Sequence, residues 1–320
     1  MRPNAEPADL QWKYWQDRAD WPGPRSFVLT HGEEILAHAA VIPGRCWSGA
    51  RHIRTLHMID WAARPSATGA GVSLMKHLRQ STDALLAIGG SAQTLKLLPH
   101  LNFQSWGKVA TCVRPLRPLG ILTRSPRGSR NRLPRTARAV LWNIQAPSGR
   151  TDGWNVRRVM PGESALLAEV LPAPTQQMAV LERAADLFEY ALQCPISPMA
   201  LYALEKDGRV RGYFLLAFVL RQARLADCWI DSDNASDWHA LIHCAVRQAK
   251  KNSEAVELAA WASDPWFSRC LLECGFHQRG ELPVQVFSRG AESLPSAPLR
   301  VQMLDNDAAY RHGGVGEFWS

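Results

Sequence analysis

IDWAARPSATGAGVSLMKHL, at residues 59–78, is the stretch of sequence that decides the fold of this chain. Ile59 and Trp61 are typical of a buried strand. Pro65 ends that strand, because proline cannot donate to a sheet ladder. A glycine turn follows, and the next apolar residues fall on one helical stripe: Val72, Leu74, Met75 and Leu78. The stretch therefore predicts a strand, a turn and an amphipathic helix.

The turn between this strand and helix contains two glycines. Gly69 and Gly71 permit dihedrals, and a close approach of the backbone, that a side chain would block. A helix that begins in such a turn directs unpaired N–H groups and its positive dipole end toward the space before it. That arrangement suits a phosphate or pyrophosphate. We therefore expect a phosphorylated cofactor at this turn.

The composition indicates a protein with two cores. The chain has 320 residues, of which 46% are apolar, and a single domain usually holds about 150 residues. No apolar run reaches the roughly 18 residues that a membrane span needs, and residues 1–15 lack the apolar core of a secretory signal. The seven cysteines include no C-x-x-C pair, which favours reduced thiols and a cytoplasmic location.

The net charge of +8 comes from one segment. Between Asp83 and Asp152 there is no acidic residue, whereas this segment holds two lysines and nine arginines. Prolines set the arginine spacing and few aromatic residues lie between, so nucleic-acid binding is not expected. Cys270 and Cys274 are one helical turn apart without further ligands at metal-site spacing, so we expect no metal site either.

The two halves of the chain repeat one order of elements. The first half is predicted to contain a hairpin at 25–47, a strand at 54–61, a helix to about 81, a strand at 84–88, a helix at 91–100 and a strand at 106–114. The second half is predicted to contain a hairpin at 200–220, a strand at 224–230, a helix at 236–250, a strand at 255–261, a helix at 264–274 and a strand at 283–288.

Two landmarks fix the register of this repeat. Ile35-Leu36-Ala37 matches Val210-Arg211-Gly212, and Leu101-Asn102-Phe103 matches Cys274-Gly275-Phe276, at offsets of 175 (212 − 37) and 173 (276 − 103). An internal duplication is the simplest account. Two unrelated α+β domains with similar landmarks are the alternative.

The repeat divides the chain into four segments. We expect an N-terminal domain at 1–115, a basic linker rich in Pro and Arg at 116–150, a second domain at 151–290 and a tail at 291–320. An amphipathic helix is possible within the linker from Arg135. The tail is expected to pack one short strand or turn on the body.

This order of elements resembles the GCN5-related N-acetyltransferase (GNAT) superfamily. ILAHAAVIP at 35–43 resembles a hairpin strand of the family, LLPHLNF at 97–103 resembles the end of a family helix, and Ser66 to Gly71 resembles its Arg/Gln-x-x-Gly-x-Gly/Ala loop. Both glycines match, and Ser66 replaces the usual Arg or Gln. The resemblance implies an α/β (α+β) chain of two tandem GNAT-like domains, each with a mixed, largely antiparallel sheet flanked by helices.

The resemblance also implies acetyl-CoA, or another acyl-CoA, as cosubstrate. Its pyrophosphate would bind the backbone of the loop, and the end of the strand would supply the N–H that polarises the thioester carbonyl. Residues after the strand at 84–88 would contact the rest of the cofactor. The cofactor-binding residues expected on this basis are Ile59, Trp61, Ala63, Ser66, Thr68, Gly69, Ala70, Gly71, Val72, Ser91 and Gln93. Ser91 could equally serve only as a helix N-cap.

The sequence departs from the family at two places. Leu98 stands where many members carry a tyrosine that protonates the thiolate of CoA, and Leu271 is its counterpart in the second half. The glycine loop is also absent from the second half, where 231–237 offers three aspartates that would repel a phosphate. The second domain is therefore interpreted as a degenerate copy that does not bind CoA conventionally and that serves as a partner or shapes the acceptor cleft.

Acyl transfer to an amine needs a group that takes the amine proton. The candidates are Asp60 and His57 beside the expected thioester, and His38 on the facing hairpin strand. His57 and Asp60 are three residues apart in a strand, which predicts that they point to opposite faces. A structural role is the default alternative for each, and ordered water is a further candidate for the proton.

The sequence therefore favours an acyl-CoA-dependent N-acyltransferase that transfers an acetyl group to a primary amine by direct attack in a ternary complex. The acceptor would be a small-molecule or protein amine, and the sequence does not identify it or the oligomeric state. The alternative is a non-catalytic GNAT-like module that binds CoA or serves in assembly.

Overall fold

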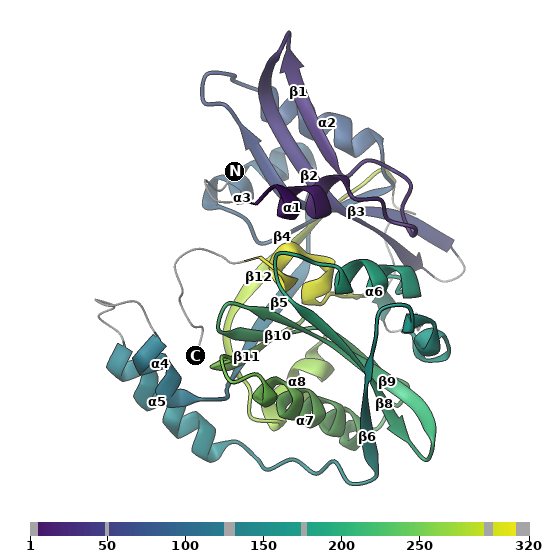
Figure 1. Cartoon of the computed structure of the whole chain (residues 1–320). Helices are drawn as coiled ribbons and strands as arrows, with labels where there is room; N and C mark the ends of the chain where they lie inside the picture. Colours follow the sequence, from purple (N-terminus) through teal and green to yellow (C-terminus); the bar gives the residue numbers. More distant parts are fainter. Residues whose placement is uncertain (1–5, 49–50, 125–131, 174–177, 291–296, 312–320) are drawn as a thin grey trace.

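A computed structural model describes residues 6–48, 51–124, 132–173, 178–290 and 297–311. In these residues one 11-stranded sheet runs through the molecule in the order β1-β2-β3-β4-β12-β5-β11-β10-β9-β8-β6, and β13 and β7 form a small second sheet (Figure 1). Most neighbours in the large sheet are antiparallel, whereas β3 and β4, and also β10 and β11, are parallel. The expected mixed, largely antiparallel sheet with flanking helices is confirmed.

The strands are β1 (Ser26–His31), β2 (Glu34–Ser48), β3 (Arg51–Ala63), β4 (Ala84–Ile88), β5 (Gln104–Pro115), β6 (Trp154–Val159), β7 (Ala179–Val180), β8 (Met199–Lys206), β9 (Arg209–Val219), β10 (Gln222–Ile230), β11 (Glu257–Ala262), β12 (His277–Ser288) and β13 (Leu299–Arg300). The α-helices are α1 (Pro7–Leu10), α2 (Ala70–Gln80), α3 (Ala92–Leu97), α4 (Pro118–Arg124), α5 (Arg132–Gln145), α6 (Ala185–Leu192), α7 (Ala235–Lys251) and α8 (Pro265–Glu273). Short 3₁₀ or π turns are η1 (Gln11–Trp15), η2 (Leu98–Leu101), η3 (Ser164–Val170), η5 (Met303–Asp305) and η6 (Asp307–Ala309).

The two halves exchange strands within the large sheet. β12, from the end of the second half, lies between β4 and β5 of the first half. β5 in turn pairs with β12 on one side and with β11 on the other, and it has no pairing with β4. The two predicted sheets are thus continuous, because each half supplies a strand to the other.

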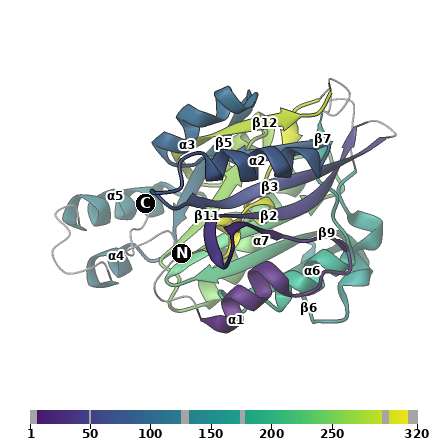
Figure 2. The ribbon, with the colours of Figure 1, turned by 90° about the horizontal axis from the view of Figure 1, so that it is seen from above.

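The basic segment between the halves contains more helix than expected. α4 lies in the part that was expected to be an irregular linker, and α5 begins three residues before Arg135. Both helices extend from the body as a pair in two perpendicular views (Figures 1 and 2).

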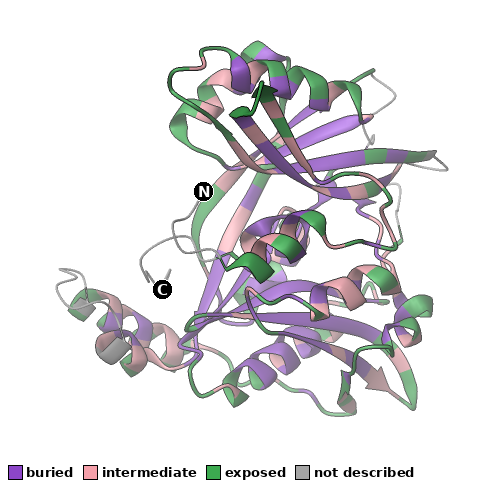
Figure 3. Ribbon diagram, turned by 45° about the horizontal axis from the view of Figure 1, so that its top comes forward, coloured by how far each residue is buried: buried purple, intermediate pink, exposed green. Residues whose placement is uncertain are grey.

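Apolar burial joins the helices to the sheet in three main clusters. α2 covers one face of β2 and β3 through residues that include Leu74 and Leu78 (Figure 2). α7 and α8 cover part of the second half in the same way. A third cluster joins the halves and contains Trp12, Phe188 and Tyr310. The exposed residues gather on the outer sides of the helices and in loops (Figure 3), as expected for amphipathic elements.

Candidate functional site

The two glycines of the turn after β3 have different structural roles. Gly69 has a φ of +84° and precedes α2, so it supplies the left-handed conformation that other residues rarely adopt. A Cβ added at Gly71 would lie 3.2 Å from the indole nitrogen of Trp61. That indole N–H donates to the Gly71 carbonyl over 3.0 Å. Gly71 therefore allows α2 to begin directly against β3.

The turn gathers backbone donors that lack acceptors. Within the described residues, no hydrogen bond is made by the amides of Thr68, Gly69, Gly71 and Val72, and no side chain caps α2. Ser66, Thr68 and Gly69 are also exposed to solvent. Unpaired amides at the positive end of a helix suit an anion.

β3 and β4 separate next to this turn. Their parallel pairing runs from Thr55 opposite Ala84 to Met58 opposite Ala87, after which β3 continues to Ala63 without β4. Beyond β4 the Gly89 amide donates to Pro283, at β12, over 2.9 Å. The strands thus diverge and leave the end of β3 unpaired on its β4 side.

The second half repeats this divergence. The pairing of β10 with β11 ends at Leu225 opposite Ala260, although β10 continues to Ile230. Each long strand also has a bulge at the divergence, at Ile59 in β3 and at Ala226 in β10. The bulges make Asp60 the structural equivalent of Asp227, and they make Trp61 the equivalent of Cys228.

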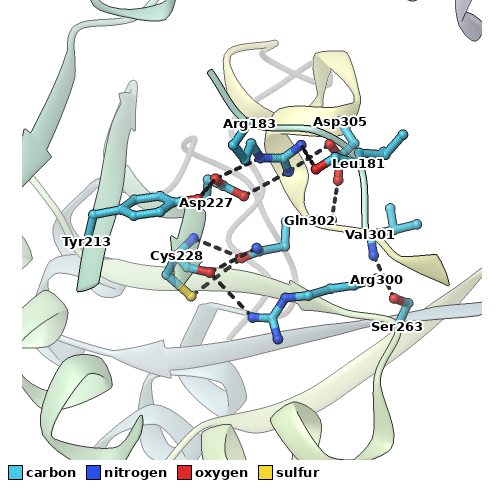
Figure 4. A network of polar contacts seen from close by, with 10 residues as sticks. All are labelled: Leu181, Arg183, Tyr213, Asp227, Cys228, Ser263, Arg300, Val301, Gln302 and Asp305. Carbon is cyan, nitrogen blue, oxygen red and sulfur yellow. Dashed lines mark hydrogen bonds and ion pairs between the residues drawn. The ribbon is translucent and has the colours of Figure 1, made fainter. Parts of the chain in front are cut away.

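The chain itself fills the divergence of the second half (Figure 4). The Gln302 side chain accepts from the Cys228 amide and donates to the Cys228 carbonyl, each over 3.0 Å. Arg300 donates to the same carbonyl over 3.4 Å. Ser263, which follows β11, donates to the Leu299 carbonyl and accepts from the Val301 amide. Residues 299–302 therefore bridge β10 and β11, and no described residue makes such contacts with Trp61 in the first half.

The helix that follows β10 also differs from α2. The Asn234 side chain caps α7 by accepting from the Ser236 amide over 2.9 Å. The Ser232 hydroxyl donates to Asp237 in the first turn of α7 over 2.7 Å. Side chains of the loop thus satisfy this helix end, and the aspartates of the loop oppose an anion. The end of α2 is therefore better suited to an anion than the end of α7.

A buried ionic cluster connects the second half to the C-terminal segment (Figure 4). Arg183 donates through two nitrogens to Asp227, each over 2.9 Å, and lies 2.8 Å from Asp305. The Tyr213 hydroxyl also donates to Asp227 over 2.8 Å. Burial opposes the Arg183 charge, but the two carboxylates hold its pKa well above the ordinary value. Burial raises the pKa of Asp305 to about 6, against the attraction of Arg183.

The structure corrects one expectation about the candidate bases. His57 and Asp60 were expected on opposite faces of their strand, but they share one face. His57 lies opposite Ile42 and Asp60 lies opposite Ala40, and these two β2 residues are two positions apart and face the same side. The physical reason is the bulge at Ile59. The extra residue shifts the alternation of side chains by one position, so Asp60 faces the same side of the sheet as His57.

Asp60 is held by ionic contacts on this face. Its carboxylate lies 2.6 Å from the Lys13 ammonium and accepts from the Tyr14 hydroxyl over 2.9 Å, and Arg311 lies 3.8 Å away. Burial alone would raise the pKa of Asp60, but Lys13 and Tyr14 together hold it below the ordinary value. Asp60 is thus an ionised, hydrogen-bonded carboxylate, and a weak base.

The two histidines differ in their hydrogen bonding. His38 lies 3.1 Å from the Ser26 hydroxyl, and burial lowers its pKa. His57 is only 2% exposed, and neither of its ring nitrogens has a hydrogen-bond partner among the described residues. Burial lowers the pKa of His57 to about 4; the nearby backbone of Asp305 opposes this shift, and Arg183 adds to it. His57 is therefore neutral near pH 7, with a free lone pair.

The remaining predicted residues lie around the same divergence. Ser91 caps α3 by accepting from the Thr94 amide over 3.1 Å, and Gln93 is exposed on the first turn of that helix. Leu98, in place of the tyrosine, is fully buried. No signal in the sequence identified Gln302, because its partner Cys228 lies 74 residues away.

The described residues contain neither a membrane-spanning helix nor a metal-binding cluster. None of their helices is long and apolar enough to cross a membrane. They also contain no group of three or more His, Cys, Asp or Glu residues that could hold a metal ion.

Comparisons with known proteins agree on the fold alone. No family model and no curated protein matches the sequence. Solved structures do match: a GCN5-related N-acetyltransferase from Kribbella flavida has a TM-score of 0.54 and 14% identity, covering 84% of this chain and 61% of that one. A GCN5-related N-acetyltransferase from Anabaena variabilis has a TM-score of 0.55 and 12% identity, covering 84% and 64%.

An N-myristoyltransferase from Saccharomyces cerevisiae, solved with bound myristoyl-CoA and inhibitors, is also similar. Its TM-score is 0.60 at 14% identity, and the match covers 92% of this chain and 73% of that one. The chain thus spans less than two thirds of the two bacterial structures and about three quarters of the yeast one. With the loop, the two divergences and the shared topology, these matches establish that the chain has the GNAT fold.

Proposed function

We propose that this chain is an acyl-CoA-dependent N-acyltransferase that binds one acyl-CoA, in its first half. The observation that carries the proposal is the contrast between two equivalent sites. No described residue makes a hydrogen bond across the first divergence, which ends at uncapped amides, whereas residues 299–302 and Asn234 satisfy the second. Buried or clustered polar groups without partners indicate a ligand, and satisfied ones do not.

The residues of the first half would divide the binding between them. The amides of Thr68, Gly69, Ala70, Gly71 and Val72, with Ser66 at the rim, would hold the pyrophosphate. The backbone from Ile59 through Trp61 to Ala63 would face the pantetheine and polarise the thioester carbonyl. Ser91 and Gln93 would contact the cofactor from α3. We propose acetyl as the acyl group.

The proposed transfer forms a carbon–nitrogen bond and breaks the carbon–sulfur bond of the thioester. The amine nitrogen bonds to the carbonyl carbon, and the carbon–sulfur bond breaks with its electron pair going to sulfur. The thiolate then takes a proton from solvent, and the amine loses one. Among the three candidates, His57 would accept a hydrogen bond from the amine, because Asp60 and His38 are already hydrogen-bonded. Its pKa of about 4 makes it a weak base, so the proton would pass on to ordered water.

The experiment that tests the site uses two variants of one exposed residue. Thr68→Asp places a negative charge among the free amides, whereas Thr68→Asn has nearly the same shape without the charge. We expect the Asp variant to weaken CoA binding at least tenfold in calorimetry and the Asn variant to change it less than threefold. Thr68→Asp should not destabilise the free protein, because a negative charge at a helix N-terminus is favourable by about 0.3–1 kcal/mol.

Wild-type protein provides the reference for this test. Acetyl-CoA at 100 times its Kd should raise the free energy of unfolding by about 2.7 kcal/mol. The absence of any thermal shift with CoA or acetyl-CoA would refute the proposal. Equal CoA affinities of the two Thr68 variants would show that the pyrophosphate does not bind at this loop.

A non-catalytic CoA-binding module is the alternative. The fully buried Leu98, in place of a proton-donating tyrosine, favours it. Thiol release from acetyl-CoA across a panel of amines separates the two functions. CoA binding without release of thiol for any amine would support the alternative.

A further inference from the structure

A cavity lies between the two halves, on the face of β3 that carries His57 and Asp60. Its volume is about 500 Å³, and its walls are the loop at 18–22, the β2 segment at 42–45, residues 181–187 and the C-terminal residues 304–305. This volume lies within the usual range for a small-molecule site. Together with His57 of β3, the walls come from five separate parts of the chain, so the cavity exists only in the folded molecule.

His57 lines this cavity, as does Trp21, whose indole nitrogen is likewise buried without a hydrogen-bond partner among the described residues. The ring nitrogens of His57 are both buried and have no partner there either. Nearly all buried polar atoms have a hydrogen-bond partner in the protein, in water or in a ligand. The χ2 torsion of histidine is broad, so a turn of the ring brings a nitrogen to the cavity edge. Water or a ligand in the cavity can supply such a partner.

The fixed charges of the cavity walls favour a cation. Arg18 is paired with Asp20, and Arg183 is shared between Asp305 and Asp227 behind the wall. The lining has four carboxylates, Asp20, Glu182, Asp186 and Asp305, against three guanidinium groups, Arg18, Arg45 and Arg183. Asp186 is exposed and has no ion pair with a described residue. An ammonium group is thus attracted to the mouth of the cavity.

The rest of the lining is apolar. Side chains from all four walls contribute: Trp21, Pro22, Ile42, Pro43, Leu181, Leu187 and Leu304. Burying apolar ligand surface against such side chains contributes about 25 cal/mol per Å². A ligand with one amine and an apolar body matches both parts of the cavity.

We propose that this cavity binds the acyl acceptor, and that the acceptor is a small primary amine with an apolar body. The inference rests on the proposed function and adds the class of its second substrate. His57 stands two residues before the bulge at Ile59, about 7 Å along the strand at 3.3 Å per residue. It accepts a hydrogen bond from the amine N–H and orients the nitrogen toward the thioester at the bulge.

The test measures the two substrates separately. Acetyl-CoA binding is followed by calorimetry, and thiol release is followed with three probes: phenethylamine, glucosamine and a short peptide with a free N-terminus. We expect phenethylamine to have the highest kcat/KM, at least tenfold above the others. Phenethylamine should also shift a histidine ring NMR signal that is missing in His57→Phe.

Variants of the cavity wall make the test specific. Ala184→Trp fills the cavity, and Ala185→Trp, just outside the lining, is its control. Asp186→Asn removes a rim charge, and Asp233→Asn in the loop after β10 is its control. Ala184→Trp should raise the KM for phenethylamine at least tenfold, and Asp186→Asn about threefold. The two controls, and the Kd of acetyl-CoA in all four variants, should stay within twofold of wild type.

The outcomes separate this inference from the proposed function. No binding of acetyl-CoA by wild type overturns the proposed function, and this inference with it. Binding of acetyl-CoA with preferential use of the peptide or glucosamine overturns the inference alone. An unchanged KM in Ala184→Trp, or thiol release with no amine, also overturns the inference.

Discussion

His57 is a buried histidine whose charge the fold opposes, and this makes stability depend on pH. Its pKa is about 4 in the folded protein, against about 6.5 for an ordinary histidine. Above pH 6.5 the imidazole is neutral in both the folded and the unfolded protein, so His57 contributes nothing to the pH dependence of stability. Between pH 6.5 and 4 only the unfolded chain binds the proton, so stability falls as pH falls.

The expected loss of stability from His57 is roughly 2 kcal/mol at pH 5, from about 1.4 kcal/mol per pH unit below 6.5. Urea unfolding between pH 7 and pH 5 measures it. His57→Leu should flatten the dependence by that amount, whereas the exposed His100→Gln should leave it unchanged. Equal slopes in wild type and His57→Leu would contradict the buried, neutral imidazole.

The equivalent aspartates of the two halves, Asp227 and Asp60, should contribute different amounts to the free energy of unfolding. Asp227 is fully buried against Arg183, so Asp227→Asn should cost roughly 3–5 kcal/mol, as when one partner of a buried ion pair is removed. Asp60 is partly exposed, so Asp60→Asn should cost about 1 kcal/mol or less. Denaturant unfolding of both variants measures the difference, and equal losses would contradict their different environments.

At the scale of elements, the C-terminal segment acts as a strand neighbour for the end of β10. Gln302→Leu leaves the buried Cys228 amide without a partner, whereas the Cys228 carbonyl keeps its hydrogen bond from Arg300. At about 1–3 kcal/mol for an unsatisfied buried group, the variant should lose roughly that much stability. Thermal unfolding tests this, with the exposed Gln93→Leu as control. A loss no greater than that of the control would show that the segment is not needed there.

The individual elements were largely predictable, and the relation between them was not. The strand, turn and helix at 59–78 follow from Pro65, Gly69 and an apolar stripe, which are local signals. The bulge at Ile59 leaves no such signal, and it moved Asp60 to the face of His57. α4 was missed because Pro118 and Gly120 are typical of loops, although a proline is tolerated in the first turn of a helix.

At the scale of the whole molecule, the exchange of β5 and β12 makes the halves interdependent. A fragment of residues 1–115 leaves β5 without β11 and β12, its partners along both edges. We therefore expect this fragment alone to be insoluble or unfolded, because unpaired edges and exposed apolar faces favour aggregation. Circular dichroism and gel filtration of the fragment test this.

A chain cut within 125–131 provides the control for that fragment. The cut lies between α4 and α5 and keeps every described strand, so the two pieces produced together should assemble. They should also bind CoA as the intact chain does. A soluble, folded 1–115 fragment would contradict the interdependence of the halves.

The sequence by itself determined the repeated order of strands and helices and the glycine turn before α2. These depend on local periodicity, on proline and glycine geometry and on helix-end chemistry, all of which act over a few residues. The tertiary structure decided which divergence is filled, which face Asp60 occupies, and where the cavity beside His57 lies. These features depend on contacts such as Cys228 with Gln302 and Lys13 with Asp60. Such contacts join distant parts of the chain, and their partners are chosen only when the whole sheet has formed.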